Sequence, residues 1–353
     1  MRRGSKPTIR DVAEKAAVSL TTVSYVLSGR HGGTTRISQP TQERVLAAVR
    51  ELGYVPNQAA RGMRRGRTDL VAVAIGDLEW PWDRALATAA ARILPEHGYQ
   101  PVILLGQAWR QFMLSGGADG VILGFIPEAK LEDETMTELA RRGVAQVVIS
   151  ETMQPAGFDV LAPEPQGGIE DGMDFLTAGH TRIACVRRTE LADRPLSRYR
   201  RYVAGLERAG IPVDETLVRT SHHRRDLAYK AALELLRLPQ RPTAIFATDD
   251  MEALQAIRAA YRLGLRVPED VQIVGVGNST EGQEADPALS TVGPDPIFEQ
   301  VVTMLVDRLD GKTPPEGVRV PAPWKLLLRG TTVQPDGDTS PVPDAENVTS
   351  GVL

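Results

Sequence analysis

The sequence contains a single cysteine among 353 residues. One cysteine cannot form an intramolecular disulfide or a cysteine-based zinc framework, and Cys185 lies inside an apolar run, which suits a reducing cytosol. No stretch of about 18 consecutive apolar residues occurs, and the basic residues 2–6 are not followed by an apolar segment. We therefore expect a cytoplasmic protein that is neither exported nor inserted in a membrane.

Motifs of catalysis are also missing. The chain has no Gly-x-Ser-x-Gly elbow, and no glycine-rich phosphate loop follows a strand pattern. His97, His180, His222 and His223 do not stand at the spacings of metal ligands. The sequence therefore predicts no enzyme, no metal site and no cofactor.

Charge is distributed unevenly along the chain. The formal net charge is −4, but residues 1–67 hold 13 basic and 4 acidic side chains, and the rest of the chain has a net charge of −13. A basic end on an acidic body predicts a polyanionic partner for that end alone. A solvated charged face is the alternative for an arbitrary basic stretch, and the helix pattern of this segment favours the polyanion.

Three short helices are predicted at the basic end. Thr8 followed by Asp11 is a helix-start signal, Ser19 can cap a second helix that ends at Ser28, and a third helix runs from near Ser38 to Gly53. The expected core side chains are Ile9, Val12, Ala13, Ala16, Val23, Val26, Leu27, Val45, Leu46, Val49 and Leu52. Two helices joined by the tight turn before Ser19 predict a helix-turn-helix headpiece.

The outward face of the second helix carries mostly short hydroxylated side chains and one tyrosine, where an exposed helix usually carries lysine and glutamate. The residues are Leu20, Thr21, Thr22, Ser24, Tyr25 and Ser28. Hydroxyl groups bond base edges and phosphates, and methyl groups contact thymine, so this face suits a DNA major groove. A helix that only packs on another domain is the alternative.

These residues carry a family resemblance. The segments Thr8-Ile9-Arg10-Asp11-Val12-Ala13, Thr22-Val23-Ser24 and Leu52-Gly53-Tyr54-Val55-Pro56-Asn57 resemble the signature of LacI/GalR repressors, and the similarity extends over roughly residues 7–332. It implies a sequence-specific DNA-binding regulator, which we expect to be a repressor, in which Thr8 also contacts DNA. Two departures are a longer loop at 29–36 and Tyr25 in place of a base-reading arginine. They imply an operator unlike the standard sequences of the family.

The segment 57–67 is similar to the family's hinge helix, which orders when two copies meet in the minor groove at the operator centre. By that similarity Met63 is the apolar wedge, Ala60 the small residue beside it and Asn57 the helix cap. The residues expected to neutralise phosphates are Arg61, Arg64 and Arg65. A helix of this length is not stable alone, so a flexible basic linker stays the alternative without DNA.

From residue 68 onward, apolar strand patterns alternate with helical patterns, which predicts parallel sheets with crossover helices. The expected strands are Leu70–Ile75, Pro101–Leu105, Gly120–Leu123, Ala145–Ile149, Arg182–Val186, Thr243–Ala247, Val271–Val276, one near Thr291-Val292, Arg319-Val320 and Leu326–Leu328. The resemblance implies an all-α headpiece at 1–56, a hinge at 57–67 and a bilobed α/β body of periplasmic-binding-protein type at 68–330. Lobe one is expected at about 68–178 and 292–312, lobe two at about 180–290 and 318–330, and a disordered tail at 331–353.

The resemblance also implies a ligand between the lobes. Arg198 stands where the family has its effector-binding arginine, and Asp249 replaces an asparagine that often bonds a sugar hydroxyl. The expected effector-binding residues are Trp80, Trp82, Glu164, Arg198, Asp249 and Asn278. Because the two tryptophans follow the first strand of the body and can stack on an apolar ring face, we expect a sugar. A degenerate cleft, with control by a protein partner or with no control, is the alternative.

The helix predicted at Met251–Leu263 has apolar residues at helical spacing: Leu254, Ile257 and Tyr261. By family position this stripe lies in a dimer interface, although such a stripe also fits a core. A homodimer is expected because one headpiece cannot supply two hinge helices to one operator. Residues 331–353 show no leucine heptads, so we expect no tetramer. An enzyme fused to a DNA-binding module is a third reading, which the missing catalytic residues disfavour.

Overall fold

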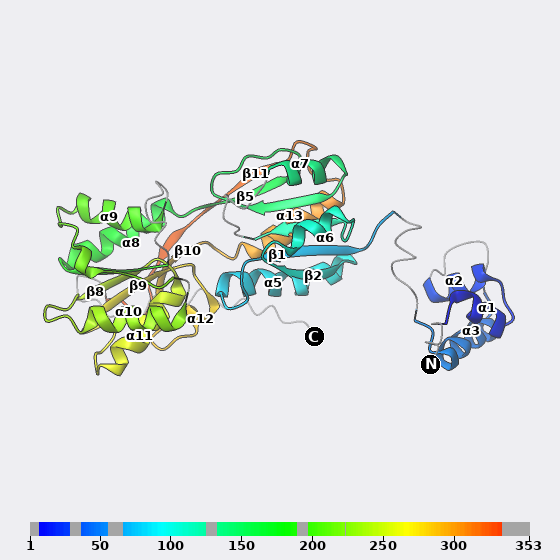
Figure 1. Cartoon of the computed structure of the whole chain (residues 1–353), viewed down its shortest axis with the longest axis horizontal. Helices are drawn as coiled ribbons and strands as arrows, with labels where there is room; N and C mark the ends of the chain where they lie inside the picture. Colours follow the sequence, from blue (N-terminus) through cyan, green and yellow to red (C-terminus); the bar gives the residue numbers. More distant parts are fainter. Residues whose placement is uncertain are drawn as a thin grey trace, which may run out of the picture. The chain divides into compact units, whose positions relative to one another are not determined.

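The computed structural model describes residues 7–28, 37–55, 66–124, 133–188, 197–222 and 224–333 (Figure 1). The chain divides into two units, residues 1–68 and residues 69–353. We call them the headpiece and the body. Each has its own hydrophobic core, so each is described by itself.

The headpiece consists of α1 (Ile9–Lys15), α2 (Leu20–Ser28) and α3 (Gln39–Leu52). The helix starts and stops are as expected from the sequence: Thr8 and Asp11 form a capping box, Ser38 precedes α3, and Gly53 ends it with a φ of 61°. The expected core is wrong at one position. Leu46 is 41% exposed and Ala48 is buried instead, because Ala48 follows Val45 by three residues and shares its helix face.

The body contains two six-stranded sheets, one in each lobe. The sheet of lobe one has the order β11-β5-β4-β3-β1-β2 and is entirely parallel. Its strands are β1 (Leu70–Ile75), β2 (Gln100–Leu105), β3 (Gly120–Leu123), β4 (Ala145–Ile149), β5 (Asp159–Glu164) and β11 (Arg319–Pro323). The sheet of lobe two has the order β12-β10-β9-β8-β6-β7, with β12 antiparallel to β10. Its strands are β6 (Ile183–Arg187), β7 (Val218–Thr220), β8 (Ala244–Ala247), β9 (Gln272–Val276), β10 (Ser290–Gly293) and β12 (Lys325–Leu327).

Helices cover both faces of each sheet, as parallel sheets require. In lobe one, α5 (Pro81–Ile93), followed by a 3-10 turn at Leu94–His97, and α13 (Phe298–Leu309) pack on one face. On the other face lie α6 (Ala108–Leu114) and α7 (Asp133–Arg141). In lobe two, α10 (Arg225–Leu236) and α11 (Asp250–Arg262) face α8 (Gln166–Gly179) and α9 (Arg198–Arg208) across the sheet. Two short elements complete lobe two, α12 (Thr280–Gln283) and a 3-10 turn at Glu215–Leu217.

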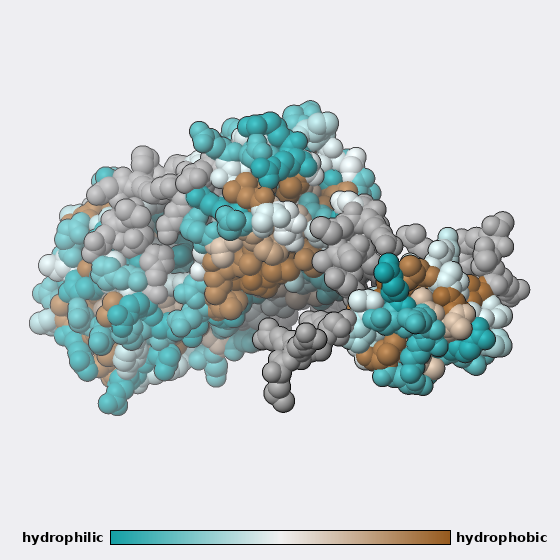
Figure 2. Space-filling view, turned by 45° about the vertical axis from the view of Figure 1, so that its right-hand side comes forward, coloured by the Kyte–Doolittle hydropathy of each residue, from teal (hydrophilic) through white to brown (hydrophobic). Residues whose placement is uncertain are grey.

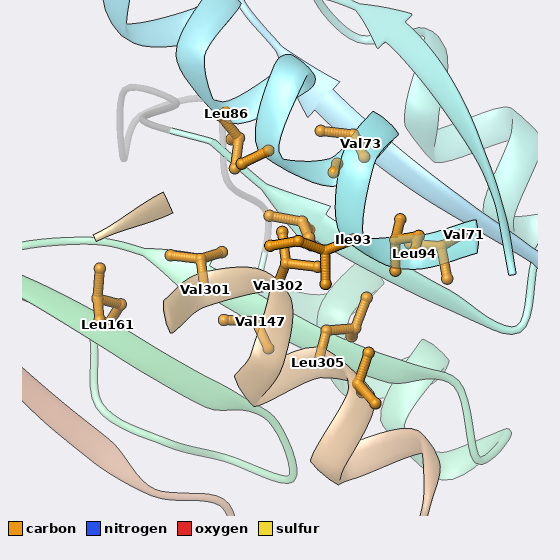
Figure 3. Packing of buried hydrophobic residues seen from close by; sticks show 14 of the residues in the cluster. Val71, Val73, Leu86, Ile93, Leu94, Val147, Leu161, Val301, Val302 and Leu305 are labelled. Carbon is orange, nitrogen blue, oxygen red and sulfur yellow. The ribbon is translucent and has the colours of Figure 1, made fainter. Parts of the chain in front are cut away.

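The core of lobe one shows how distant parts of the chain are brought together. Figure 3 shows Val301, Val302 and Leu305 of α13 pointing toward β-strand residues such as Val147 and toward α5. All four of these side chains are fully buried. A helix near the end of the sequence therefore completes the lobe that begins the body.

Three expected boundaries inside the body are corrected by the structure. Helix α8 was expected in lobe one, but it packs on α9, β10 and β12 of lobe two. Strand β10 begins at Ser290 and belongs wholly to the sheet of lobe two, whereas residues from 292 were expected in lobe one. Strand β11 was expected in lobe two, but it pairs with β5 in lobe one, with Val320 opposite Leu161. Lobe identity depends on these long-range pairings, which a local pattern does not encode.

The first residues of the predicted disordered tail are ordered. Thr331 is fully buried in lobe two, where its hydroxyl accepts from the Ser290 amide at 2.8 Å and donates to the Ile273 carbonyl at 2.7 Å. Disorder was expected from residue 331. Residues 334–353, which make up the rest of that prediction, lie outside the described residues.

Candidate DNA-binding face and effector site

Helix α2 presents the side chains expected to meet DNA. Tyr25 is 50% exposed, and Leu20, Thr21 and Ser24 are also exposed. These four residues form an outward face on the helix that follows the turn. Their contacts with base edges stay a prediction.

Two other predicted contacts have a structural role within the headpiece. The Thr8 hydroxyl donates to the Asp11 carboxylate at 2.8 Å in the capping box of α1. The Thr22 hydroxyl lies 2.9 Å from the Ser19 hydroxyl, which also accepts from the Thr22 amide at 3.1 Å. Both side chains therefore hold a helix N-terminus in place, and a DNA contact would be an additional role.

The remaining predicted DNA contacts are not tested by the structure. Ser28 is the last residue of α2. The hinge residues Asn57, Ala60, Arg61, Met63, Arg64 and Arg65 lie outside the described residues.

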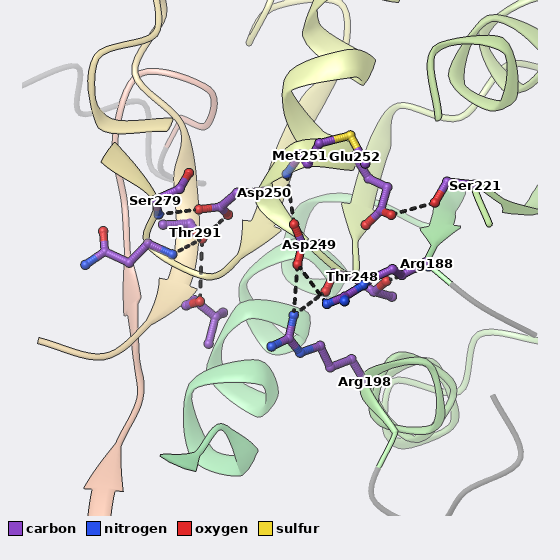
Figure 4. Close-up of polar contacts among 12 residues, drawn as sticks. Arg188, Arg198, Ser221, Thr248, Asp249, Asp250, Met251, Glu252, Ser279 and Thr291 are labelled. Carbon is purple, nitrogen blue, oxygen red and sulfur yellow. Dashed lines mark hydrogen bonds and ion pairs between the residues drawn. The ribbon is translucent and has the colours of Figure 1, made fainter. Parts of the chain in front are cut away.

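In the body, polar side chains meet where the strands of lobe two end (Figure 4). Asp249 follows β8 and caps α11, accepting from the Met251 amide at 3.1 Å. Its other carboxylate oxygen lies 3.5 Å from Arg188, which follows β6, and 3.6 Å from Arg198, the first residue of α9. Arg198 also donates to the Thr248 carbonyl at 2.7 Å. The structure thus brings together two predicted effector residues, Arg198 and Asp249.

A second carboxyl group lies beside this pair. Glu252 is fully buried in α11 and accepts from the Ser221 hydroxyl at 2.6 Å, while its other oxygen has no hydrogen-bond partner among the described residues. Burial raises the pKa of Glu252 well above its ordinary value, Asp249 raises it further, and Ser221, Arg188 and Arg198 oppose the rise. Burial therefore shifts Glu252 toward its protonated form, in the opposite direction to the effect of the two arginines.

Asp250 joins three elements of lobe two just beneath the site. One carboxylate oxygen accepts from the Ser279 amide at 2.6 Å, and the other accepts from the Thr291 hydroxyl at 2.5 Å (Figure 4). Burial raises the pKa of Asp250 to about 6, against the lowering effect of these two hydrogen bonds. The start of α11, and with it Asp249, is held against β9 and β10.

Both predicted stacking tryptophans pack between the lobes. Trp80 is 8% exposed and packs with Ala228 and Met251 of lobe two, while the Arg188 guanidinium lies 4.6 Å from its ring centroid. Trp82 contacts the cores of both lobes. A sugar would therefore reach the Arg188 side of the Trp80 ring only by displacing that guanidinium, which corrects the expectation of an available stacking face there.

Two aromatic neighbours surround Trp82. Its ring centroid lies 4.8 Å from Phe298 in an edge-to-face arrangement and 5.7 Å from Trp324. Arg198 lies over Trp324, 5.2 Å from the ring centroid. Trp324 stands between β11 and β12, where the chain crosses from lobe one to lobe two, and its position places the crossover against the effector-site arginine.

The lobes are also joined on one rim. Arg225 of α10 donates to the Glu79 carbonyl at 2.9 Å, and Arg84 of α5 forms an ion pair with Glu281 of α12. Exposed ion pairs contribute little to stability, about 1 kcal/mol or less. These contacts therefore orient the lobes more than they stabilise the fold.

Two other predicted effector-binding residues, Glu164 and Asn278, make their contacts elsewhere in the body. Glu164 ends β5 and lies 3.6 Å from Arg319 on the adjacent strand β11. The Asn278 side chain donates to the Pro294 carbonyl at 3.0 Å and accepts from Arg329 at 2.7 Å. Its φ of 52° is a conformation that asparagine tolerates well. The hydrogen bonds of Asn278 within lobe two argue against its predicted role in ligand binding.

The predicted dimer residues line one groove. Leu254, Ile257 and Tyr261 border it together with Pro81 of lobe one and Glu281 of lobe two. Ile257 is buried and Leu254 is partly buried against the core of lobe two, whereas Tyr261 is 49% exposed. Figure 2 shows apolar areas among a mainly hydrophilic surface on one face of the molecule. Tyr261 is the residue of this stripe most available to a partner.

The part of the chain that the structure describes contains neither a candidate metal site nor a candidate membrane-spanning helix. No cluster of histidine, cysteine or acidic side chains there could hold a metal ion. None of the helices in the same part of the chain has the length and apolar character needed to span a bilayer.

Comparison with known proteins identifies the family. Residues 8–57 match the bacterial regulatory proteins of the lacI family, and residues 174–332 match a periplasmic binding protein-like domain. The chain is 31% identical over 340 residues to the HTH-type transcriptional repressor CytR of Escherichia coli K12, covering 92% of this chain and 96% of that repressor. The chain belongs to the lacI family. Another relative of this lacI-family chain is the HTH-type transcriptional regulator CelR of Thermobifida fusca, 31% identical over 93% of this chain and 99% of CelR.

Solved structures agree with the fold. A CelR–cellobiose complex is 30% identical, has a TM-score of 0.58 and covers 92% of this chain and 100% of that one. The lac repressor dimer bound to operator and the anti-inducer ONPF is 24% identical, with a TM-score of 0.70 and coverage of 93% and 100%. The predicted family and fold class, a helix-turn-helix headpiece with a bilobed α/β body, are confirmed. This lacI-family chain is a DNA-binding transcriptional regulator.

Sequence reasoning missed four residues that the structure places at or beside the candidate effector site of this lacI-family regulator: Arg188, Ser221, Glu252 and Trp324. Arg188 could have been found because it follows a predicted strand at its carboxyl end, where ligands of parallel sheets bind. Glu252 gave no such signal, because acidic residues are common in the first turn of a helix. Ser221 and Trp324 could not be found from the sequence around them. Each is brought to the site by long-range pairing of strands, which the local sequence does not encode.

Proposed function

We propose that this regulator is a cytoplasmic repressor that binds a pseudo-palindromic operator as a homodimer and responds to a sugar held between the lobes of its body. The observation that carries the effector part is the meeting of Arg188, Arg198 and Asp249 at the strand ends of lobe two. The cellobiose complex of CelR supports a sugar as the ligand class. We also propose that the protein has no catalytic activity, so purified protein should turn over neither sugars nor nucleosides.

Operator recognition is tested at Tyr25. Footprinting on the promoter of the regulator's own gene would identify an operator for the assay. Tyr25→Ala should weaken binding to that operator by about 1–3 kcal/mol and binding to random DNA very little, because base contacts carry specificity and phosphate contacts do not. Arg10 is at an exposed position of α1. Arg10→Ala removes a positive charge and should weaken binding to the operator and to random DNA by similar amounts, so it serves as the control for a non-specific effect. Equal losses on both DNAs for Tyr25→Ala would remove Tyr25 from the specificity set.

The homodimer is tested at Tyr261. Tyr261→Lys places a charge on the exposed end of the α11 stripe and should raise the dimer dissociation constant at least about tenfold, as expected for a central aromatic contact. Sedimentation velocity over a concentration series measures this change. Glu207→Lys on α9, another exposed helix position, introduces the same side chain and should leave the dimer intact. A dimer unaffected by Tyr261→Lys would place the interface elsewhere.

A regulator with a degenerate cleft is the second candidate. It is favoured by the packing of Trp80 and Trp82 between the lobes, which leaves fewer ring faces for a ligand. In that case no small molecule would alter operator binding, and a protein partner or no signal would control the regulator.

A further inference from the structure

Arg201 lies beside the candidate effector site, and Glu151 is within electrostatic range of both Arg198 and Arg201. It lies one turn after Arg198 on α9. Its Nε and Nη2 atoms are buried, and no hydrogen-bond acceptor reaches them in the described part of the chain. Leaving such donors without an acceptor costs free energy, more so when the group is charged. These two donors can therefore bind an acceptor group of a ligand.

Other donors nearby are in the same condition. The indole N–H groups of Trp82 and Trp324 are buried without an acceptor. Arg198, which lies over Trp324, makes a single hydrogen bond in the described structure, to the Thr248 carbonyl. Its contact with Asp249 is an ion pair at 3.6 Å, longer than a hydrogen bond. This part of the interlobe region therefore holds several donor groups that no acceptor of the described residues reaches, although the carboxylates of Asp249 and Glu151 lie close by.

Positions three apart on a helix are neighbours, with about 5–6 Å between Cβ atoms. The guanidinium groups of Arg198 and Arg201 therefore belong to one face of α9 and can bind one ligand group together. Guanidinium groups bind the planar or tetrahedral oxygens of carboxylate and phosphate through paired hydrogen bonds, which adds both energy and orientation. A neutral sugar hydroxyl can accept one of these hydrogen bonds, but it does not offer the paired oxygens that a guanidinium group binds.

Acidic side chains lie among the arginines of this region. Glu151 and Glu170 lie near enough to Arg201 to raise its pKa against the effect of burial. Asp249 lies between Arg188 and Arg198. These carboxylates accept from hydroxyl groups and repel anions, so a ligand that fits the whole site carries hydroxyls beside its acidic group.

We propose that the effector is an acidic sugar, one that carries a phosphate or a carboxylate group, and that Arg201 together with Arg198 binds this anionic group. This inference rests on the proposed function, because it names the ligand class of the same site. It assigns to Arg201 a specificity role: the residue selects acidic sugars over their neutral parents.

The test uses the full-length chain and matched sugars at constant ionic strength. Melting temperature is measured with glucose, glucose 6-phosphate and glucuronate, with galactose, galactose 6-phosphate and galacturonate, and with cellobiose and inorganic phosphate. An acidic sugar should raise Tm while its neutral parent does not. The phosphate and carboxylate arms distinguish the two acidic groups.

Variants then locate the contact. Arg201→Gln should raise the dissociation constant of the stabilising acidic sugar about tenfold or more, the usual effect of losing a hydrogen bond to a charged group. Arg200→Gln, at an exposed position next to it on α9, should leave that constant unchanged. Arg201→Lys should bind with intermediate affinity, because it keeps the charge and loses the paired donors.

Three results would overturn the assignment: neutral sugars stabilise the protein and acidic ones do not, no acidic sugar raises Tm, or the stabilisation survives in Arg201→Gln. A shift produced by inorganic phosphate and by no acidic sugar counts against it as well. Operator binding without ligand is measured on the same preparations. Its loss would contradict the proposed function, whereas intact operator binding with a failed sugar panel contradicts the ligand class alone.

Discussion

Replacing Arg308 by methionine should lower the free energy of unfolding of the body by about 3–5 kcal/mol, the usual cost of breaking a buried ion pair on one side. Arg308 near the end of α13 is 10% exposed, and its partner Asp159 at the start of β5 is fully buried. The two side chains are joined by a hydrogen bond of 3.0 Å. Without the guanidinium, the Asp159 carboxylate stays in the core with one accepted bond, from the Val318 amide at 2.8 Å.

Arg308 also links segments distant in sequence. Its guanidinium donates to the carbonyls of Gly157, Pro314 and Pro315, so it fastens the turn before β5 and the segment before β11 to the end of α13. The methionine side chain is similar in length and leaves these carbonyls without that donor. The substitution should therefore destabilise β5 and β11, the two strands at this edge of the sheet, together.

Urea denaturation of the wild type and the variant measures the change. Arg141→Met on α7 is the matched control, because Arg141 pairs with Glu138 at the surface and should lose less than about 1 kcal/mol. Burial already raises the pKa of Asp159 despite Arg308. Because the variant removes the charge that opposes this rise, its defect should be smaller at low pH, where the carboxyl group is protonated. A loss equal to that of the control would show that the pair is not a stabilising contact.

The strands of the body could be predicted where apolar runs are continuous. Leu70–Ile75, Gly120–Leu123 and Ala145–Ile149 were predicted with the bounds that the structure has, because strands covered by helices on both faces read as unbroken apolar segments. Strand β7, three residues with a central arginine at the edge of its sheet, has no such run and was missed.

The assignment of elements to lobes needed three-dimensional information. Strands β11 and β12 are separated by Trp324 alone, yet they belong to different sheets. Helix α8 joins lobe two because Gly168 and Gly172 leave room for close contact with Val292, where added methyl groups would lie 2.7 and 3.2 Å away. Neither fact follows from the hydrophobic pattern of its own segment.

The candidate effector site could likewise be predicted in part. Arg198 and Asp249 were expected together from family resemblance and from the strand-end rule, and the structure places them 3.6 Å apart. Trp82 was expected to face a ligand, and the structure places it against Phe298 and Trp324. A residue's position after a strand can be read from the sequence, but the direction of a large side chain depends on partners supplied by distant segments.

Asp250 leads to the second large effect, a dependence of stability on pH. Its folded-state pKa is about 6, above its ordinary value of 3.8. A raised carboxyl pKa means that folding favours the protonated form, so the contribution is fully present below about pH 4 and is lost as the pH rises through about 6. The shift of roughly two units corresponds to about 3 kcal/mol. Asp249 contributes to the rise, and Arg329 faces Asp250 as the opposing charge.

Asp250→Asn should remove this dependence while keeping an acceptor for the Ser279 amide. We expect the difference in unfolding free energy, wild type minus variant, to fall by about 3 kcal/mol between about pH 4 and pH 7 in urea titrations. Glu138→Gln is the control, because the pH dependence of its contribution to the unfolding free energy has the opposite sign. Arg142 holds the pKa of Glu138 below its ordinary value, so that carboxylate stabilises the fold more as the pH rises. A difference between wild type and Asp250→Asn that stays constant over this range would mean that Asp250 ionises as readily in the folded state as in the unfolded chain, and that burial beneath the effector site is fully offset by Ser279, Thr291 and Arg329.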